Sequence, residues 1–571
     1  MHDSANPVIV RHFRQILVWP LQLMPLRAAD QVQRHFEALE QVGSGNPWQE
    51  VLDEFTGDPT QFQERHYREF VTFLPYVQRF LYGQGRSSTS LRGYGESPIR
   101  VYRRSDIAFV RVTCMDEVSI DLCVKHVDLH FFYDVDVVIL ALEVHADDLP
   151  LSRVQEIMYR FGRTFPAQWD KDGRASHCMR KVEWIGNQGE VLAVSDFNDR
   201  AKYLTHACEH RASTVGAHWE YLLQPMAQHH SEQPGLIRYR QLEYHRLPKM
   251  TYLSFDDPFV LTREDFVRLG LATRPDDGQG LHHSEKTIED FERDHCYDRF
   301  WSPARRDPRS STRIVCTGHS FIMIGSQRLP LFADPEMGLL GQFRHQYFQL
   351  GLIAHFHRAA LLMMSDRLVV AVSRLDIRSQ ESIRYFKRSI RQTMEIFLRF
   401  NHRYWFHEVS KQVVAKDLFR LWSHQLGNDA LFTELREEVQ DMSDYLDSDD
   451  ARRQSDTVLR LTVVTILGLV GTIVTGFLGM NLIAEADQPL LVKVGFFASV
   501  FLPTLVLTLY TVQKSRALSE FLDTMSDERL PLRKKMASLL RVWRKPVASE
   551  PGLVEVPTRA RRRARALANR R

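Results

Sequence analysis

The chain has 571 residues, of which 44% are hydrophobic and 25% charged, a composition that excludes wholesale disorder, a collagen-like chain and a disulfide scaffold. The mean hydropathy of −0.30 excludes a protein built largely of membrane spans, yet two spans would occupy only about 7% of the chain and would vanish in this average. The 74 Lys+Arg nearly balance the 71 Asp+Glu, so the net charge indicates no particular partner. Six scattered cysteines and a polar N-terminus suit a reducing compartment, so we expect most of the chain to be cytosolic.

The first 340 residues predict an N-terminal helical region and then an α/β region. Apolar residues recur at helical spacing in 36–42 and 70–80, so residues 1–84 are expected to be helical, and the Gly/Ser-rich segment 83–97 reads as a linker. Residues 85–340 then carry β-branched and aromatic runs typical of strands, a helical segment at 151–165, and a polar excursion at 274–313. The expected strands are 107–113, 118–124, 127–144, 191–194 and 314–324.

Residues 341–460 predict a long helical hairpin that forms a stalk. Residues 347–364 are apolar, but His355, His357 and Arg358 lie at their middle, which favours a helix buried in protein over a membrane span. A second helix is expected over 379–426, ended by Gly427, and a third from Asp429 towards Leu478.

Two uncharged segments predict a transmembrane hairpin. Residues 461–482 form a first uncharged run, and residues 494–512, with Pro503 inside, form a second. Residues 483–493 are the short outer turn, and residues 513–571 are a basic cytoplasmic tail. Basic residues flank the two segments on the side away from this turn, so both termini are expected to be cytoplasmic. The predicted fold is therefore an α+β cytoplasmic domain followed by a long stalk helix and a two-helix C-terminal transmembrane hairpin, in a multi-pass protein of the cell (inner) membrane.

One face of the first uncharged segment is small and hydroxylated. At 100° per residue its members fall within an arc of about 80°, and Leu461 shares that arc near the cytoplasmic end. The members of this face are Thr465, Gly468, Thr472, Thr475 and Gly479. Two interpretations remain open: close packing of membrane helices, or the wall of a pore whose hydroxyls bond the water shell of an ion.

The first segment ends in Gly479-Met480-Asn481. This tripeptide, placed at the outer end of the first of two C-terminal spans, resembles the motif of the CorA family of magnesium transporters. The resemblance implies a homopentamer whose first spans surround an axial pore, lined by the hydroxylated face and closed outside by a Gly-Met-Asn selectivity filter. It further implies that Mg²⁺ is the transported ion and that no resident cofactor is needed.

The sequence departs from the family around this motif. Leu478 and Leu482 stand where the family has aromatic residues, and the outer turn lacks the usual Met-Pro-Glu-Leu pattern, although its Glu485 and Asp487 can still attract cations. A Zn²⁺ transporter, or one for another divalent metal of the same superfamily, therefore stays open as an alternative. On an ideal helix Asn481 lies about 160° from Thr465, so we expect the helix to unwind near Gly479.

Eight acidic residues lie between Glu434 and Asp450. A solvated helix face is one interpretation. The other, implied by the resemblance, is a regulatory Mg²⁺ site for which Asp441, Asp444 and Asp447 are the candidates. The arginine-rich C-terminus is expected to meet anionic lipid rather than nucleic acid.

No phosphate-binding loop, nucleophile elbow or catalytic triad is found, and the spacing of His206, Cys208 and His210 matches no standard zinc site. The leading hypothesis is thus a divalent-cation channel of CorA type, gated by bound cytoplasmic cation, and not an enzyme. The alternative from a different class is a membrane-anchored sensor or scaffold without a pore.

Overall fold

The computed structural model describes residues 7–513, apart from residues 27–33, 52–63, 84–97, 133–134, 233–234, 244, 276–279, 377–378 and 480–488. The chain divides into two compact units, Met1–Val439 and Gln440–Arg571. The first unit contains a large sheet with helices around it, and the second contains most of helix α14 (Asn428–Gly479) and helix α15 (Leu490–Gln513). An α+β unit followed by long helices is confirmed.

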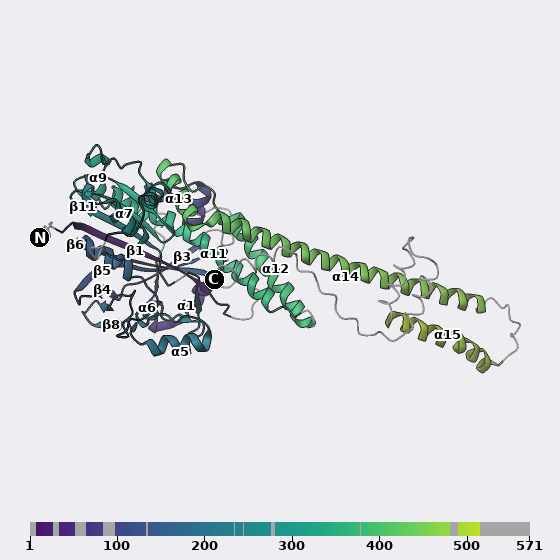
Figure 1. The fold of residues 1–571 in the computed structure, drawn as a ribbon. Coiled ribbons are helices and arrows are strands. Elements are labelled where there is room, and N and C mark those ends of the chain that lie inside the picture. Colours follow the sequence, from purple (N-terminus) through teal and green to yellow (C-terminus); the bar gives the residue numbers. More distant parts are fainter. Residues whose placement is uncertain are drawn as a thin grey trace. The chain divides into compact units, whose positions relative to one another are not determined.

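One sheet dominates the first unit (Figure 1). Its strands are β1 (Ile9–Leu23), β2 (Gln49–Glu50), β3 (Ile99–Arg104), β4 (Ile107–Thr113), β5 (Ser119–Phe132), β6 (Val137–Pro150), β7 (Lys181–Gly186), β8 (Val191–Val194), β9 (Ala227–Gln228), β10 (Arg238–Gln241), β11 (Lys249–Phe255), β12 (Cys296–Tyr297), β13 (Arg313–Cys316) and β14 (Ser320–Ser326). The main order is β12-β13-β14-β11-β1-β6-β5-β4-β7-β8. The pairs β11/β14 and β9/β10 are parallel, and the other pairs are antiparallel.

The other helices of the first unit are α1 (His35–Glu40), α2 (Glu64–Thr72), α3 (Pro75–Tyr82), α4 (Leu151–Arg160), α5 (Arg200–His210), α6 (Ala217–Leu223), α7 (Arg263–Leu271), α8 (Glu285–His295), α9 (Pro330–Ala333), α10 (Leu339–Gln342), α11 (Phe348–Ser373), α12 (Gln380–Arg403) and α13 (Val413–Leu426). A π-helical turn, Phe343–Tyr347, leads directly into α11.

Strand β1 corrects the expectation that residues 1–84 are helical. It lies between β6 and β11, and every residue from Phe13 to Leu23 is buried. A strand covered on both faces shows no alternation of apolar and polar residues, which is the pattern by which a strand is recognised in a sequence. The helical patterns at 36–42 and 70–80 do correspond to helices, namely α1 and parts of α2 and α3. Residues 84–97 of the expected linker lie outside the described residues.

The expected strands of the α/β region form with some changes of boundary. Segments 107–113 and 191–194 are β4 and β8, and the predicted helix from Leu151 is α4, which ends at Arg160. The long segment 127–144 is divided between β5, which ends at Phe132, and the antiparallel β6, which begins at Val137, and no Gly or Pro between them marks the division in the sequence. Segment 314–324 likewise forms two strands, β13 and β14. The expected excursion at 274–313 contains the regular helix α8.

Helix α11 confirms the prediction of a helix buried in protein. Both His355 and His357 are buried, and the His357 Nε2 donates to the carbonyl oxygen of Tyr404 at 2.6 Å. On the side of the sheet, Phe356 stacks on Phe132 of β5 with ring centroids 4.0 Å apart. The apolar character of this helix therefore reflects burial on all sides within the first unit.

The prediction of one helix over 379–426 is wrong, because α12 and α13 are separated by residues 404–412. Aromatic residues in this break are held by tertiary contacts: Trp405 stacks on Phe432 with centroids 4.3 Å apart, and Phe406 meets Phe80 edge-on at 5.4 Å. Local periodicity cannot reveal such contacts, which override helix propensity.

The turn between α13 and α14 forms where the sequence predicts it. Gly427 ends α13 with a φ of 69°, a left-handed conformation that glycine adopts without a Cβ clash. Helix α14 then begins at Asn428, whose side-chain Nδ2 donates to the carbonyl oxygen of Ala354 in α11 at 2.9 Å. This hydrogen bond fixes the first residue of α14 against the buried helix.

Burial of histidines in the first unit makes its stability depend on pH. Burial lowers the pKa of His355 and His218 to about 3 and that of His130 to about 4. The unfolded chain, with a histidine pKa of about 6.5, therefore takes up protons that the folded chain does not, so stability is full above pH ~6.5 and falls as the pH is lowered, by at most about 1.4 kcal/mol per pH unit for each histidine.

We expect His355→Leu to reduce this pH dependence by about one proton between pH 7 and pH 5, measured by denaturant unfolding at a series of pH values. The exposed His283→Leu serves as the matched control and should leave the slope unchanged. An unchanged slope in His355→Leu would contradict the assignment of a neutral buried imidazole.

Candidate functional site

The predicted pore-lining residues all lie on helix α14. This helix is 52 residues long and ends at Gly479, and helix α15, with Pro503 inside it, begins at Leu490. The remaining predicted filter residues, Met480 and Asn481, and the acids Glu485 and Asp487 of the outer turn lie outside the described residues. The orientation of Asn481 and the unwinding expected near Gly479 therefore stay predictions.

The threonine hydroxyls of the small face all donate hydrogen bonds to backbone carbonyl oxygens of α14. The Oγ1 atoms of Thr465, Thr472 and Thr475 donate to the carbonyl oxygens four residues earlier at 2.8, 2.9 and 2.9 Å. Threonine within a helix commonly makes this bond, and it leaves the oxygen lone pairs pointing away from the helix as acceptors. The face consequently presents hydrogen-bond acceptors rather than donors.

The same face is uncovered in the single chain. The Leu461 side chain is 67% exposed, Thr465 and Thr472 are exposed, and Thr475 is half-buried. A Cβ placed on Gly468, Gly476 or Gly479 would meet no atom within 4 Å. The described residues of one chain thus provide no packing partner for the small residues.

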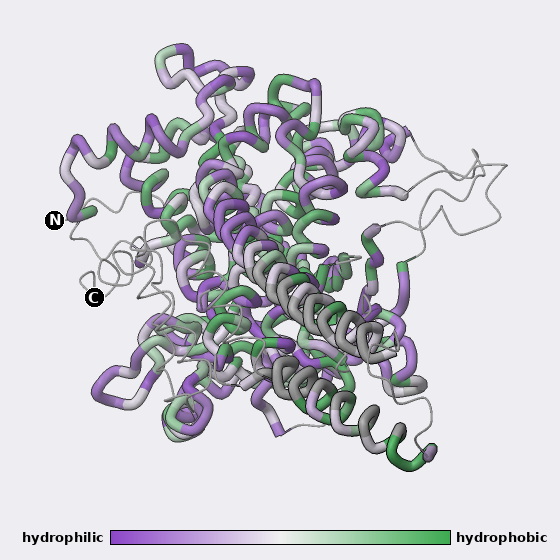
Figure 2. The backbone as a smooth tube through the Cα atoms, turned by 90° about the vertical axis from the view of Figure 1, so that its right-hand side faces the viewer, coloured by the Kyte–Doolittle hydropathy of each residue, from purple (hydrophilic) through white to green (hydrophobic). Residues whose placement is uncertain are grey.

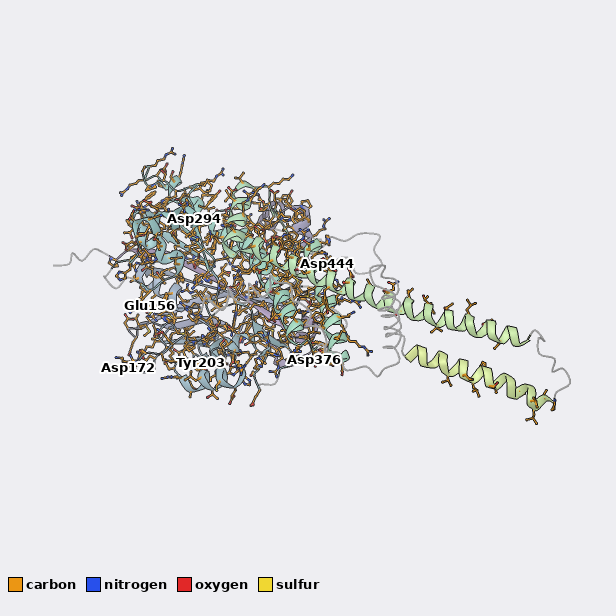
Figure 3. The ribbon with its side chains drawn as sticks, turned by 45° about the vertical axis from the view of Figure 1, so that its right-hand side comes forward. Glu156, Asp172, Tyr203, Asp294, Asp376 and Asp444 are labelled. Carbon is orange, nitrogen blue, oxygen red and sulfur yellow. The ribbon has the colours of Figure 1, made fainter. Side chains whose placement is uncertain are left out.

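The three candidate regulatory carboxylates are exposed on α14. Asp441, Asp444 and Asp447 follow one another at intervals of three residues, so they share one side of the helix, and Figure 2 shows this part of α14 as hydrophilic. Asp444, labelled in Figure 3, accepts a hydrogen bond from the Gln440 Nε2 at 2.9 Å. The side chains thus carry acidic charge that faces solvent in the single chain.

Histidine and cysteine side chains do not form a metal centre in the part of the chain that the structure describes, where no group of three or more suitable ligands is found. The rings of His206 and His210 are 4.6 Å apart, and His210 stacks on His230 at 5.4 Å. Cys178 is buried, and burial raises its thiol pKa to about 12, so a metal-binding thiolate is disfavoured there.

Among the described residues, no helix combines the length and the apolar character that crossing a bilayer requires.

Comparison with protein families finds a match in the C-terminal part of the chain. Residues 370–512 match the family described as CorA-like Mg2+ transporter protein, so this segment is similar to that family. The match runs from the end of α11 through α12, α13 and α14 and reaches Val512 in α15. Neither the curated proteins nor the solved structures contain a match to this chain.

The family resemblance recognised from Gly479-Met480-Asn481 is thus confirmed, and the matched segment includes every site residue predicted on α14. The threonine-to-backbone bonds were not foreseen, although threonine at a helix-interior position is a signal for them. The first 369 residues lie outside the match, so the function of the sheet is not addressed by it.

Proposed function

We propose that the protein is a channel or transporter for divalent cations, with Mg²⁺ as the transported ion. The observation that carries this proposal is the family match over residues 370–512, which contains α14 and the Gly-Met-Asn tripeptide. In this proposal residues 461–482 and 494–512 cross the cell (inner) membrane, residues 483–493 form the outer turn, and both termini are cytoplasmic.

The proposed assembly is a homopentamer with α14 of each copy around the central axis. Support comes from the uncovered small face of α14, for which the described residues of one chain provide no packing partner, because small residues on a membrane helix suit the close approach of a neighbouring helix. Five copies would surround a water-filled pore with this face. The basic tail, residues 513–571, is proposed to contact anionic lipid on the cytoplasmic side.

The chemistry of the face suits an ion that keeps its water. Mg²⁺ dehydrates reluctantly, and the waters it holds direct their hydrogens outward. Threonine oxygens whose own protons are bound to the backbone accept hydrogen bonds from such waters without displacing them. The Asn481 side-chain oxygen and the Gly479 carbonyl are proposed to act in the same way at the outer mouth, as neutral ligands that bind weakly enough to release the ion.

In this proposal the outer end and the cytoplasmic end of the pore have different roles. Glu485 and Asp487, ten carboxylates in a pentamer, would raise the local cation concentration at the outer side. Leu461 would form a ring near the cytoplasmic end, and a ring of leucines can close a pore by excluding water. Asp441, Asp444 and Asp447 would bind Mg²⁺ between neighbouring copies when it is plentiful and hold the pore closed.

The first test replaces the filter side chain. Asn481→Ala should lower Mg²⁺ uptake into proteoliposomes by about tenfold or more, because the ring of carbonyl oxygens is lost. The control is Gln488→Ala in the same outer turn, which removes an amide outside the tripeptide. Normal uptake by a correctly assembled Asn481→Ala variant would support a scaffold without a pore, and uptake of Zn²⁺ but not Mg²⁺ by the unmodified protein would overturn the assignment of the ion.

The second test addresses the hydroxylated face. Thr472→Val keeps the shape of the side chain and removes the acceptor oxygen, so we expect Mg²⁺ flux to fall severalfold while the assembly is preserved. The matched control is Thr462→Val, because Thr462 makes the same backbone bond at 2.9 Å but lies about 60° outside the arc of the face. Equal flux in both variants would indicate that the face packs helices and does not line a pore.

The third test concerns regulation. Asp444→Ala combined with Asp447→Ala should relieve the inhibition of transport by high internal Mg²⁺ and leave transport at low Mg²⁺ unchanged, measured with a fluorescent Mg²⁺ indicator in proteoliposomes. Glu381→Ala, on α12, is the control for loss of an acidic side chain. Unchanged inhibition in the double variant would mean that these carboxylates form a solvated helix face and do not regulate transport.

A further inference from the structure

Three cationic side chains meet beneath the surface of the first unit. Arg163 follows α4 and Arg246 precedes β11, and the two residues face each other as an isolated antiparallel bridge. Lys249 is the first residue of β11, and its backbone N–H donates to the carbonyl oxygen of His319 at 3.0 Å. Arg163 is 5% exposed, Lys249 is 2% exposed, and Arg246 is half-buried.

The hydrogen-bond partners of these three cations are all neutral. Arg163 donates to the carbonyl oxygen of Tyr159 at 3.1 Å and to the His245 Nε2 at 2.6 Å. Arg246 donates to the carbonyl oxygens of Leu271 and Ala272 at 3.1 and 3.3 Å, and the Lys249 ammonium donates to that of Met158. Within the described residues no carboxylate lies within 4 Å of any of the three groups.

This arrangement is an exception in the molecule. Six arginines are buried in the described part of the chain, and five of them have a carboxylate within reach. The five pairs are Arg14 with Glu143, Arg104 with Asp106 at 2.6 Å, Arg160 with Glu156 at 3.5 Å, Arg268 with Glu264 at 3.7 Å, and Arg313 with Asp298 at 2.8 Å. Arg163 is the sixth. Glu156, labelled in Figure 3, is already paired with Arg153 and Arg160.

Burial of these cations beside one another lowers their pKa values. Burial, reinforced by the charges of Arg246 and Arg163, lowers the pKa of Lys249 well below its usual value, and burial together with Arg246 lowers that of Arg163 to about 10. Burial and these arginines also lower the pKa of His245 to about 4, so its ring is neutral at pH 7. A buried cation without a counter-charge is unfavourable, and a bound anion would reverse each of these shifts.

We propose that Arg163, Arg246 and Lys249 form a binding site for a multiply charged oxyanion of the phosphate class. Two planar guanidinium groups offer paired N–H donors that match phosphate oxygens, and the ammonium adds a third cation. The half-buried His177 and the exposed His319 lie near the cluster: burial, and after it the charges of Arg163 and Arg246, lower the pKa of both rings. A ligand with two or more negative charges neutralises the cluster better than a single carboxylate.

The test is phosphate binding by the full-length protein in detergent. Inorganic phosphate and ATP, both without Mg²⁺ and at constant ionic strength, are titrated by calorimetry and by thermal unfolding, with chloride as the monovalent control. We expect phosphate to bind and to raise the unfolding midpoint. Binding of both ligands identifies the phosphate group itself as the recognised element, and binding of ATP alone identifies a nucleotide site.

Variants separate the cluster from general surface charge. Arg246→Gln and Lys249→Met should each weaken phosphate binding by about tenfold or more, since each removes one charge-assisted contact. Arg111→Gln, which removes an exposed arginine paired with Asp121, should bind as the unmodified protein does. If Lys249→Met fails to fold, Arg246→Gln decides the outcome.

Absence of binding to the unmodified protein, or equal binding by the variants and the control, would overturn the proposal. The readouts do not involve ion flux, so the result is independent of the proposed transport function.

Discussion

The requirement to bury helix α11 on every side determines how the rest of the first unit is arranged. One side of this helix is covered by the sheet, where Phe356 stacks on Phe132, and another by α13, where Trp422 lies so close that a Cβ on Gly351 would come within 2.5 Å of the indole. Substituting Gly351 would therefore force this packing apart. Helix α11 follows the sheet in the chain, and the segment that matches the CorA-like family begins at residue 370, near the end of this helix.

The start of α14 depends on the same packing. The Asn428 side chain is bound to a carbonyl of α11, and Trp405 holds the break before α13 by stacking on Phe432. Aromatic contacts and one buried amide thus fix where the long helix begins.

The sequence predicted the elements that have strong local patterns and missed those set by distant contacts. Strands β4 and β8, the buried α11, and the turn at Gly427 were all identified from composition and periodicity. Strand β1 was missed because burial on both faces removes its alternation, and the break at 404–412 was missed because its cause lies in Phe80 and Phe432.

The functional residues also fall into those that local sequence patterns predicted and those that depend on distant contacts. The family motif at Gly479 and the hydroxylated face are contiguous in sequence, so they could be identified directly, and the match over residues 370–512 supports the family resemblance. The cluster of Arg163, Arg246 and Lys249 could not be read in this way, because residue 163 lies more than eighty positions from its partners and no motif joins them. The antiparallel backbone bridge between Arg163 and Arg246 brings these charges together in the folded chain.

The backbone bonds of the threonines on α14 have a consequence for the sign of the charge that this face favours. Each hydroxyl proton is committed to a carbonyl of its own helix, so the outward ends of these dipoles are negative along the whole row. A surface of this kind offers acceptor oxygens to donors such as the waters around a cation, although it bears no formal charge. Since none of these groups titrates, that preference is set by helix geometry alone and is the same at every pH at which the helix is folded.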